Sequence, residues 1–258
     1  MKKQTTNFVI EANEVCGERC HKLVLRHPGR LPEVMAGQFV EVLVPDCSGV
    51  MLRRPISIHD CDYERNLLVL LVQRVGKGTE RVTDMKVGET LNLVYPLGNG
   101  FLHTFDQLPM RPLLVGGGIG AAPLLLVARR LLMSGSRPVI LIGARTEGLI
   151  PARGSFESLG VDVRYSTEDG TLGERGLVTA NSAMGNDYDA ILTCGPTPMM
   201  KAVAHVAMER GIACEVSLEN MMACGLGACL CCVTETTEGH KCVCQEGPVF
   251  TPQTLKWL

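Results

Sequence analysis

Short runs of apolar and β-branched residues dominate the first part of the chain, and none of them grows into a helical pattern. Turn-forming residues at 27–29, 45–46 and 87–89 separate the runs. Several short strands without a long helix are typical of a small antiparallel barrel. The predicted strands are Phe8–Ile10, Cys20–Leu25, Gln38–Val44, Pro55–Ile58, Leu67–Val75 and Thr90–Val94.

The pattern changes near Leu108 and Pro109, where runs of strand length begin to alternate with segments of helical length. This alternation predicts an open parallel sheet with helices packed on it. The predicted strands are Leu113–Val115, Val139–Ile142, Val161–Tyr165, Ala190–Leu192 and Ala213–Val216, and the predicted helices are Ala121–Met133 and Pro198–Arg210. A cysteine-rich tail begins at Glu219, so we expect a barrel, an α/β unit and a small cysteine module in that order.

The composition is that of a folded globular protein, with 46% hydrophobic and 20% charged residues among 258. A formal net charge of −2 provides no basic field for nucleic acid or an anionic membrane, so we expect neither as a partner. The longest uncharged run, 112–128, is shorter than the ~20 residues of a membrane span. The first residues lack an apolar export segment, so we expect a cytoplasmic, reducing location.

Six of the twelve cysteines lie between Cys224 and Cys244. In a reducing compartment, clustered cysteines indicate metal or redox chemistry. The C-x4-C-x2-C spacing followed by a further cysteine is typical of a plant-type [2Fe–2S] site. Its four members are Cys224, Cys229, Cys232 and Cys244. Gly225 and Gly227 would let this loop curl with its N–H groups facing the sulfur atoms.

Zinc is the main alternative metal for this cluster. Zinc ribbons usually combine two C-x2–4-C pairs, and the C-x-C pair of Cys242 and Cys244 is a poor second pair. Cys231 and Cys242 are left over from the [2Fe–2S] pattern. We interpret them first as small buried side chains, which is a common role for free cysteine.

A glycine-rich loop follows the predicted strand Leu113–Val115. Gly116-x-Gly118-x-x-Ala121 matches the G-x-G-x-x-G/A pattern between a strand and a helix. The glycines of the loop are Gly116, Gly117, Gly118 and Gly120. They would let a dinucleotide lie against the backbone at the helix start, and a structural tight turn explains them equally well.

The choice of coenzyme stays open at this point. After the second strand of the predicted sheet come Arg145 and Glu147. A carboxylate such as Glu147 would favour the free 2′-hydroxyl of NAD, whereas Arg145 would hold a 2′-phosphate.

A nicotinamide exchanges two electrons at once, whereas an iron–sulfur cluster exchanges one, so a chain with both sites needs a converter such as a flavin. One candidate flavin site is Arg54-Pro55-Ile56-Ser57, where Arg54 would pair with a pyrophosphate and Ser57 would hydrogen-bond the isoalloxazine edge. A second is the turn at 76–79, whose amides would face a phosphate. A surface arginine and a hairpin turn are the simpler alternatives.

The chain resembles the ferredoxin-reductase-like flavoproteins and, more narrowly, the electron-transfer subunits of class 1B dihydroorotate dehydrogenases. The shared segments, in the same order, are RPIS (54–57), VGKGT (75–79), PLGNGF (96–101), GGGIGAAPL (116–124), CGPTPMM (194–200), CGLGACLCC (224–232) and VCQEGPVF (243–250). The resemblance implies a six-stranded antiparallel flavin-binding barrel at 1–104. It also implies a ferredoxin-reductase-like parallel-sheet nucleotide-binding domain at 105–217 and a small C-terminal [2Fe–2S] module at 218–258.

The resemblance also implies roles for individual residues. FAD would bind through Arg54, Pro55, Ile56, Ser57, Leu71, Val72, Gln73, Gly78 and Thr79. The loops on the nicotinamide side would be Gly116, Gly117, Gly118, Gly120, Cys194, Gly195 and Pro196, and the cluster ligands Cys224, Cys229, Cys232 and Cys244. Cys194 would lie near the nicotinamide, with a packed thiol as an equal alternative. Ile56 replaces an aromatic residue common in the wider superfamily, so Phe101, Phe250 and Trp257 are candidates to stack on the flavin.

No proton-abstracting base lies beside an evident pocket for an organic substrate in this sequence, which indicates that the substrate site is on another polypeptide. The resemblance implies an FMN-containing dihydroorotate dehydrogenase catalytic subunit as that partner, in a heterotetramer with two copies of each. Electrons would pass from it through the cluster and FAD to NAD⁺ in pyrimidine biosynthesis, and this chain would contribute no residue that oxidises dihydroorotate.

Two other functions stay open from the sequence. The same cofactors would serve a small subunit of another NAD(P)H-linked complex, of the ferredoxin–NADP transhydrogenase or sulfide dehydrogenase type. A non-enzymatic α/β binding protein with a structural zinc site would instead be colourless and would contain one zinc and no flavin.

Overall fold

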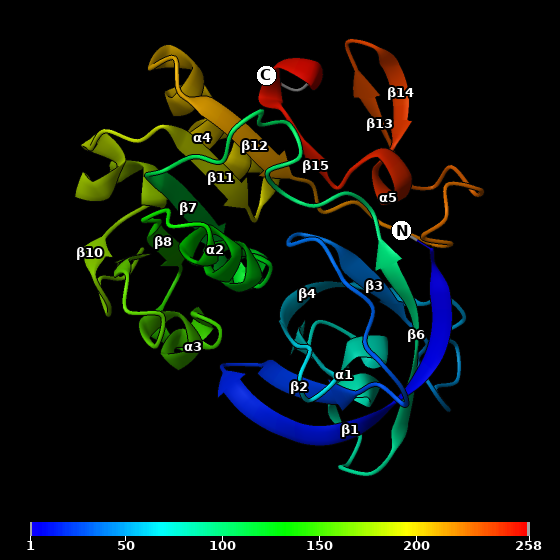
Figure 1. Ribbon diagram of the computed structural model, residues 1–258. Helices are drawn as coiled ribbons and strands as arrows, with labels where there is room; N and C mark the ends of the chain where they lie inside the picture. Colours follow the sequence, from blue (N-terminus) through cyan, green and yellow to red (C-terminus); the bar gives the residue numbers. More distant parts are fainter. Residues whose placement is uncertain (1, 257–258) are drawn as a thin grey trace.

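The computed structural model describes residues 2–256, and its first unit is a closed barrel (Figure 1). Its strands are antiparallel and close in the order β1-β2-β5-β4-β3-β6. They are β1 (Gln4–Gly17), β2 (Cys20–Arg26), β3 (Phe39–Val42), β4 (Arg54–Asp62), β5 (Leu67–Gln73) and β6 (Thr90–Leu97). The predicted barrel is confirmed. β1 is longer than its apolar run because its outer residues are mostly polar and face solvent.

Alternate residues of the barrel strands fill its interior, as the two-residue period of a strand requires. Phe8 and Ile10 on β1 and Tyr95 on β6 are completely buried there. The short helix α1 (Lys77–Thr83) follows β5. The turn predicted at 76–79 is instead the first turn of this helix, because the Thr79 hydroxyl accepts the N–H groups of the two residues that precede Lys77, at 3.0 and 3.2 Å.

The second unit is a seven-stranded sheet in the order β10-β9-β8-β7-β11-β12-β15. Its strands are β7 (Pro112–Gly117), β8 (Val139–Ala144), β9 (Asp162–Thr167), β10 (Glu174–Arg175), β11 (Ala190–Cys194), β12 (Ala213–Ser217) and β15 (Val249–Phe250). All neighbours are parallel except β15, which runs antiparallel to β12. The predicted parallel sheet is confirmed. The sequence did not predict β10 and β15, because a strand of two residues is too short to show a pattern of apolar and polar positions.

Helices cover both faces of this sheet (Figure 1). They are α2 (Leu124–Met133), α3 (Arg153–Glu157) and α4 (Thr197–Glu209), with 3₁₀ turns at Gly118–Ala121, Glu147–Leu149, Val178–Ala180 and Ser182–Gly185. The buried side chains of α2 belong to the hydrophobic core that includes the barrel interior, and Leu114 of β7 lies in the same core. The buried side chains of α4 belong to a second core on the other face of the sheet, together with Leu113 of β7. α2 begins later than predicted because a 3₁₀ turn and the N-cap Pro123 precede it.

The C-terminal segment is tied to both other units. It contains the hairpin β13 (Val233–Thr236) and β14 (Gly239–Cys242), the single turn α5 (Val243–Glu246), β15 and a 3₁₀ turn at Pro252–Thr254. β13 and β14 pair in an antiparallel hairpin. β15 extends the sheet, and the Asn99 N–H at the end of the barrel donates to Gly247 O at 2.6 Å. The proposed boundaries at 104 and 217 stay predictions.

Buried polar contacts fix the barrel against the sheet. His59 Nδ1 on β4 donates to Ala122 O at 2.7 Å. The completely buried Glu215 on β12 accepts the Leu102 N–H at 2.6 Å and both the N–H and the hydroxyl of Thr104 at 3.1 and 2.6 Å. A buried carboxylate with three donors stabilises the linker that leaves the barrel. In residues 2–256 no helix combines the length and the apolar character that a membrane crossing needs.

His59 predicts a pH dependence of folding. Burial lowers the pKa of its imidazole from 6.5 to about 4. The unfolded chain therefore takes up a proton that the folded chain does not, and stability falls as the pH falls from about 6.5 to about 4, by about 3 kcal/mol. His59→Asn keeps a donor for Ala122 but cannot be protonated, so its urea unfolding free energy should fall less over this range. An equally steep fall in both proteins would contradict this role.

Candidate functional site: two adjoining cavities and a cysteine loop

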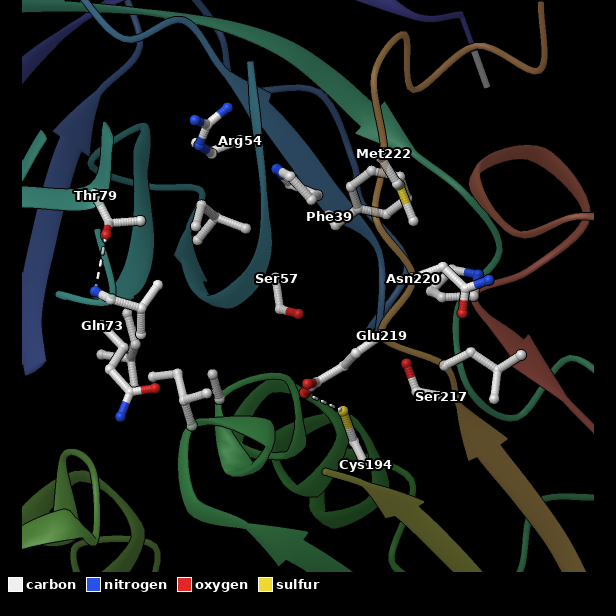
Figure 2. Close-up of a pocket in the computed structure, with 18 residues that line it drawn as sticks. Phe39, Arg54, Ser57, Gln73, Thr79, Cys194, Ser217, Glu219, Asn220 and Met222 are labelled. Atoms are coloured by element: carbon white, nitrogen blue, oxygen red, sulfur yellow. Dashed lines mark hydrogen bonds between the residues drawn. The ribbon is translucent and has the colours of Figure 1, made fainter. Parts of the chain in front are cut away.

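A cavity of about 380 Å³ lies where β4 and β5 of the barrel face the segment that follows β12 (Figure 2). All four residues of the predicted flavin strand line it, namely Arg54, Pro55, Ile56 and Ser57. Leu71 and Gln73 from β5 and Thr79 from α1 complete this wall. The sequence prediction therefore brought together residues that share one cavity.

Two predicted flavin residues do not line the cavity with their side chains. Val72 is buried in the barrel core, since neighbouring residues of a strand point to opposite faces. Gly78 leaves room for the Arg54 side chain, because a Cβ at position 78 would lie only 3.0 Å from Nε of Arg54. The start of α1 can thus lie directly against the Arg54 guanidinium. A guanidinium beside closely approached backbone fits a pyrophosphate, so the observed surface fits FAD.

The aromatic ring among the residues that line this cavity belongs to Phe39, which the sequence analysis missed. Phe39 lies on β3 opposite Ser57. Phe101 packs against Gly37 instead, and Phe250 lies on β15, and neither lines the cavity. Trp257 lies outside the described residues. Nothing in the sequence distinguished Phe39, because the apolar residues around it have the composition of any buried strand.

A second cavity of about 570 Å³ lies at the carboxyl ends of β7, β8 and β11. Ligands of open parallel sheets bind at this edge, where the strand order reverses. Gly117, Gly118 and Pro196 line the cavity, in agreement with their predicted place in the nucleotide loops. Gln73, Ile119 and Glu219 line both cavities, so the two spaces adjoin.

The remaining glycines of the two loops allow close packing. A Cβ at Gly116 would lie 2.7 Å from the Cβ of Ala121, and one at Gly120 would lie 2.5 Å from the Cα of Gly195. A Cβ at Gly195 itself would lie 2.9 Å from the Gly117 nitrogen. Any side chain at these positions would push the loops apart, so the glycines keep the ends of β7 and β11 in contact.

Cys194 lies on the first cavity rather than the second. Its Sγ is 3.9 Å from Oε1 of Glu219 (Figure 2). Burial raises the pKa of the Cys194 thiol well above its usual value, so the thiol stays protonated at neutral pH. Burial also raises the pKa of Glu219, whose accessible surface faces the two cavities. The junction thus holds a carboxyl group able to keep a proton, and sequence reasoning missed Glu219 because it belongs to no motif.

The cysteine loop curls as its glycines predicted. Gly225 and Gly227 have φ values of 67° and 81°. Backbone amides point at the sulfur atoms, with Leu226 N 3.3 Å from Cys224 Sγ and Gly227 N 3.1 Å from Cys244 Sγ. Amide donors to cysteine sulfur tune and stabilise iron–sulfur clusters, so the loop fits such a cluster.

The four predicted ligands meet as two pairs of thiols, Cys224 with Cys229 and Cys232 with Cys244. Within residues 2–256, no three His, Cys, Asp or Glu side chains converge closely enough to hold a metal ion as they stand. The ligand assignment therefore stays a prediction. The interpretation of the two spare cysteines as buried side chains is wrong, since Cys231 is exposed and Cys242 is half-buried. Their thiols contact backbone carbonyls, Cys231 that of Met221 at 3.7 Å and Cys242 that of Gly227 at 3.9 Å.

Glu41 lies between the flavin strand and the cysteine loop. It is completely buried on β3, opposite Pro55, and neither of its carboxyl oxygens has a partner among the described residues. Burial raises its pKa to about 7, although Arg53 acts in the opposite direction. A Cβ at Gly225 would lie 2.6 Å from the Cγ of Glu41, so the loop packs directly on this side chain. A buried carboxyl group without a hydrogen-bond partner destabilises the fold, and this one lies beside the candidate site.

The barrel, the sheet and the two cavities define a ferredoxin-reductase-like flavoprotein with an added cysteine module. The family described as "Iron-sulfur cluster binding domain of dihydroorotate dehydrogenase B" matches residues 219–256. A solved structure of an NADH-dependent reduced ferredoxin–NADP oxidoreductase superposes with a TM-score of 0.85 and 29% identity, over 97% of this chain and 90% of that one. Phthalate dioxygenase reductase shares the fold, with a TM-score of 0.68 and 19% identity over 90% of this chain and 87% of its own.

Curated relatives define the family more narrowly. The dihydroorotate dehydrogenase B (NAD(+)) electron transfer subunit of Bacillus cereus (strain Q1) is 37% identical in an alignment 258 positions long that covers 97% of each chain. That of Shouchella clausii (strain KSM-K16) is 36% identical in an alignment 256 positions long that covers 96% of each chain. The chain belongs to the family of dihydroorotate dehydrogenase B electron transfer subunits, and the resemblance found in the sequence is confirmed.

Adjacent cysteines provide a direct test of the ligand assignment. Cys232→Ala removes a buried thiol of the predicted ligand set, so the purified protein should lose the long-wavelength absorbance of the cluster and most of its iron. Cys231→Ala is the matched control and should keep both, because the exposed Cys231 thiol contacts only a carbonyl in the described residues. Equal iron loss in the two variants, or retention in both, would contradict the assignment.

Proposed function

We propose that the first cavity binds FAD, that the second binds the nicotinamide coenzyme, and that Cys224, Cys229, Cys232 and Cys244 hold a [2Fe–2S] cluster. Arg54 would face the pyrophosphate of FAD, with Gly78 allowing the close approach, and Ser57 would contact the isoalloxazine edge. When bound, FAD supplies the exchange between two-electron hydride chemistry and the one-electron chemistry of the cluster.

This proposal is supported above all by one observation, which is that Gln73, Ile119 and Glu219 line both cavities. A nicotinamide ring in one cavity and a flavin ring in the other would then meet at these three residues. Met222 also lines the first cavity and lies two residues before Cys224. One short segment therefore leads from the proposed flavin site into the cysteine loop.

We infer that electrons come from an FMN-containing dihydroorotate dehydrogenase catalytic subunit and leave as NADH, within pyrimidine biosynthesis. The names of the curated relatives, which are electron transfer subunits, support a separate catalytic partner. Dihydroorotate would be oxidised on that partner, and we assign no residue of this chain to that step.

Exposed apolar side chains near Cys229 support a contact surface for the partner. Cys229 is exposed, and Leu226 and Leu230 on the same loop are 45% and 64% exposed. Met221, just before the loop, is 86% exposed. Apolar side chains gathered on the surface are typical of interaction sites. We propose that this loop faces the catalytic subunit in a heterotetramer with two copies of each chain, located in the cytoplasm.

A second candidate function keeps the cofactors and changes the partner. The similarity to the NADH-dependent reduced ferredoxin–NADP oxidoreductase structure favours a small subunit of a transhydrogenase-type complex. The higher identity to the dihydroorotate dehydrogenase relatives over nearly the full chain favours the first function. The division into FAD-binding (1–104), NAD-binding (105–217) and cluster-binding (218–258) parts belongs to either proposal.

Reconstitution tests the proposal. The full chain with FAD and cluster, mixed with an FMN-containing dihydroorotate dehydrogenase catalytic subunit, should form NADH from NAD⁺ and dihydroorotate, and neither chain alone should do so. Leu230→Glu should lower this rate at least ten-fold at limiting partner concentration, because a charge would enter the proposed contact. Val87→Glu is the matched control, since Val87 is 63% exposed on the barrel. NADH formation with reduced ferredoxin, and none with dihydroorotate, would favour the second function.

A further inference from the structure

Two charged side chains lie on the outer part of the second cavity. Arg145 directly follows β8 and Glu168 directly follows β9, and both are exposed and line the cavity. The Glu168 N–H donates to Ala144 O at 3.1 Å, which fixes the end of β9 against the end of β8. The position of Glu168 is therefore set by the sheet, although it follows a strand that carries no nucleotide motif.

Neighbouring acidic side chains are already occupied. Glu147 forms an ion pair with Arg153 at 2.7 Å and does not line the cavity. The Asp169 carboxylate accepts the N–H and the hydroxyl of Thr171 at 3.0 and 2.7 Å. Glu174 accepts the N–H of Ser182 at 2.9 Å. Of these four acidic residues at the outer part of the sheet, Glu168 is the one whose carboxylate makes no hydrogen bond or ion pair within residues 2–256, so it is free to meet a ligand.

The strand order predicts which part of a dinucleotide each charge would meet. The glycine loop follows β7, and β8 and then β9 lie further out in the sheet. A dinucleotide with its nicotinamide at the shared wall of the cavities and its pyrophosphate on the glycine loop would extend its adenosine over β8 and β9. Arg145 then lies nearer the pyrophosphate, and Glu168 lies nearer the adenosine ribose.

We propose that Glu168 determines coenzyme specificity, by accepting hydrogen bonds from the ribose hydroxyls of NADH and by excluding the 2′-phosphate of NADPH. This inference rests on the proposed function of the second cavity. A 2′-phosphate carries about −1.5 to −2 charge at neutral pH and would face the carboxylate directly. A hydroxyl that donates to a carboxylate instead gains a charge-assisted hydrogen bond. The assignment puts Glu168 in the place of Glu147, which the sequence offered as one of two alternatives beside Arg145.

Paired variants test the assignment in the full chain loaded with FAD and cluster. Glu168→Gln should reduce the preference for NADH over NADPH at least ten-fold, measured as the ratio of the rate constants for anaerobic flavin bleaching at low coenzyme concentration. ADP-ribose and 2′-phospho-ADP-ribose, which carry no nicotinamide, should show the same change in the ratio of their dissociation constants. Glu168→Arg should change both ratios further in the same direction. Glu147→Gln is the matched control and should leave them unchanged.

The outcomes separate this inference from the proposed function. If NADH bleaches the wild-type flavin but Glu168→Gln changes both ratios less than two-fold, the assignment of Glu168 is wrong and the proposed function stands. A change with Glu147→Gln and none with Glu168→Gln would also overturn the assignment. If neither coenzyme bleaches the flavin nor either nucleotide fragment binds, the proposed function of the cavity is itself wrong.

Discussion

The antiparallel pairing of β15 with β12 is the contact on which the arrangement of the three sites depends. Ser217 pairs with Val249 where the chain leaves the sheet, and the Leu218 N–H donates to Pro248 O at 2.9 Å. From there the chain passes Glu219 and Met222 on the cavity walls and enters the cysteine loop. A strand of only two residues thus fixes both ends of the cysteine module on a rigid sheet, which is what precise placement of neighbouring cofactors requires.

Close backbone approach and two carboxyl groups of raised pKa, Glu41 and Glu219, gather at the same junction. Gly116, Gly120 and Gly195 let the ends of two strands meet with no side chain between them. Glu41 is buried against the cysteine loop with no hydrogen-bond partner among residues 2–256, and Glu219 lies at the wall between the cavities. Such groups lower the stability of a fold, and proteins retain them mainly where function needs them. Their concentration beside the proposed electron path gives this junction a physical signature that is independent of any motif.

Local patterns were sufficient for the barrel, the parallel sheet and the cysteine loop. Short apolar runs such as Leu67–Val75 predicted strands, and the spacing from Cys224 to Cys232 predicted cluster ligands, because both depend only on neighbours along the chain. Phe39, Glu219 and β15 were missed because tertiary contacts define their roles. Glu168 shows the same limit. The sequence left Glu147 and Arg145 as alternatives, and only the folded sheet shows that Arg153 already pairs with the Glu147 carboxylate.

We propose that this one chain connects a nicotinamide site, a flavin site and a cluster through the segment between Ser217 and Cys224. An anaerobic titration of the holoprotein with NADH, followed by visible absorption and electron paramagnetic resonance, tests it most directly. We expect the flavin to bleach and the signal of a reduced [2Fe–2S] cluster to appear in the same titration. A flavin that bleaches while the cluster stays oxidised, or a colourless protein that contains zinc, would contradict it.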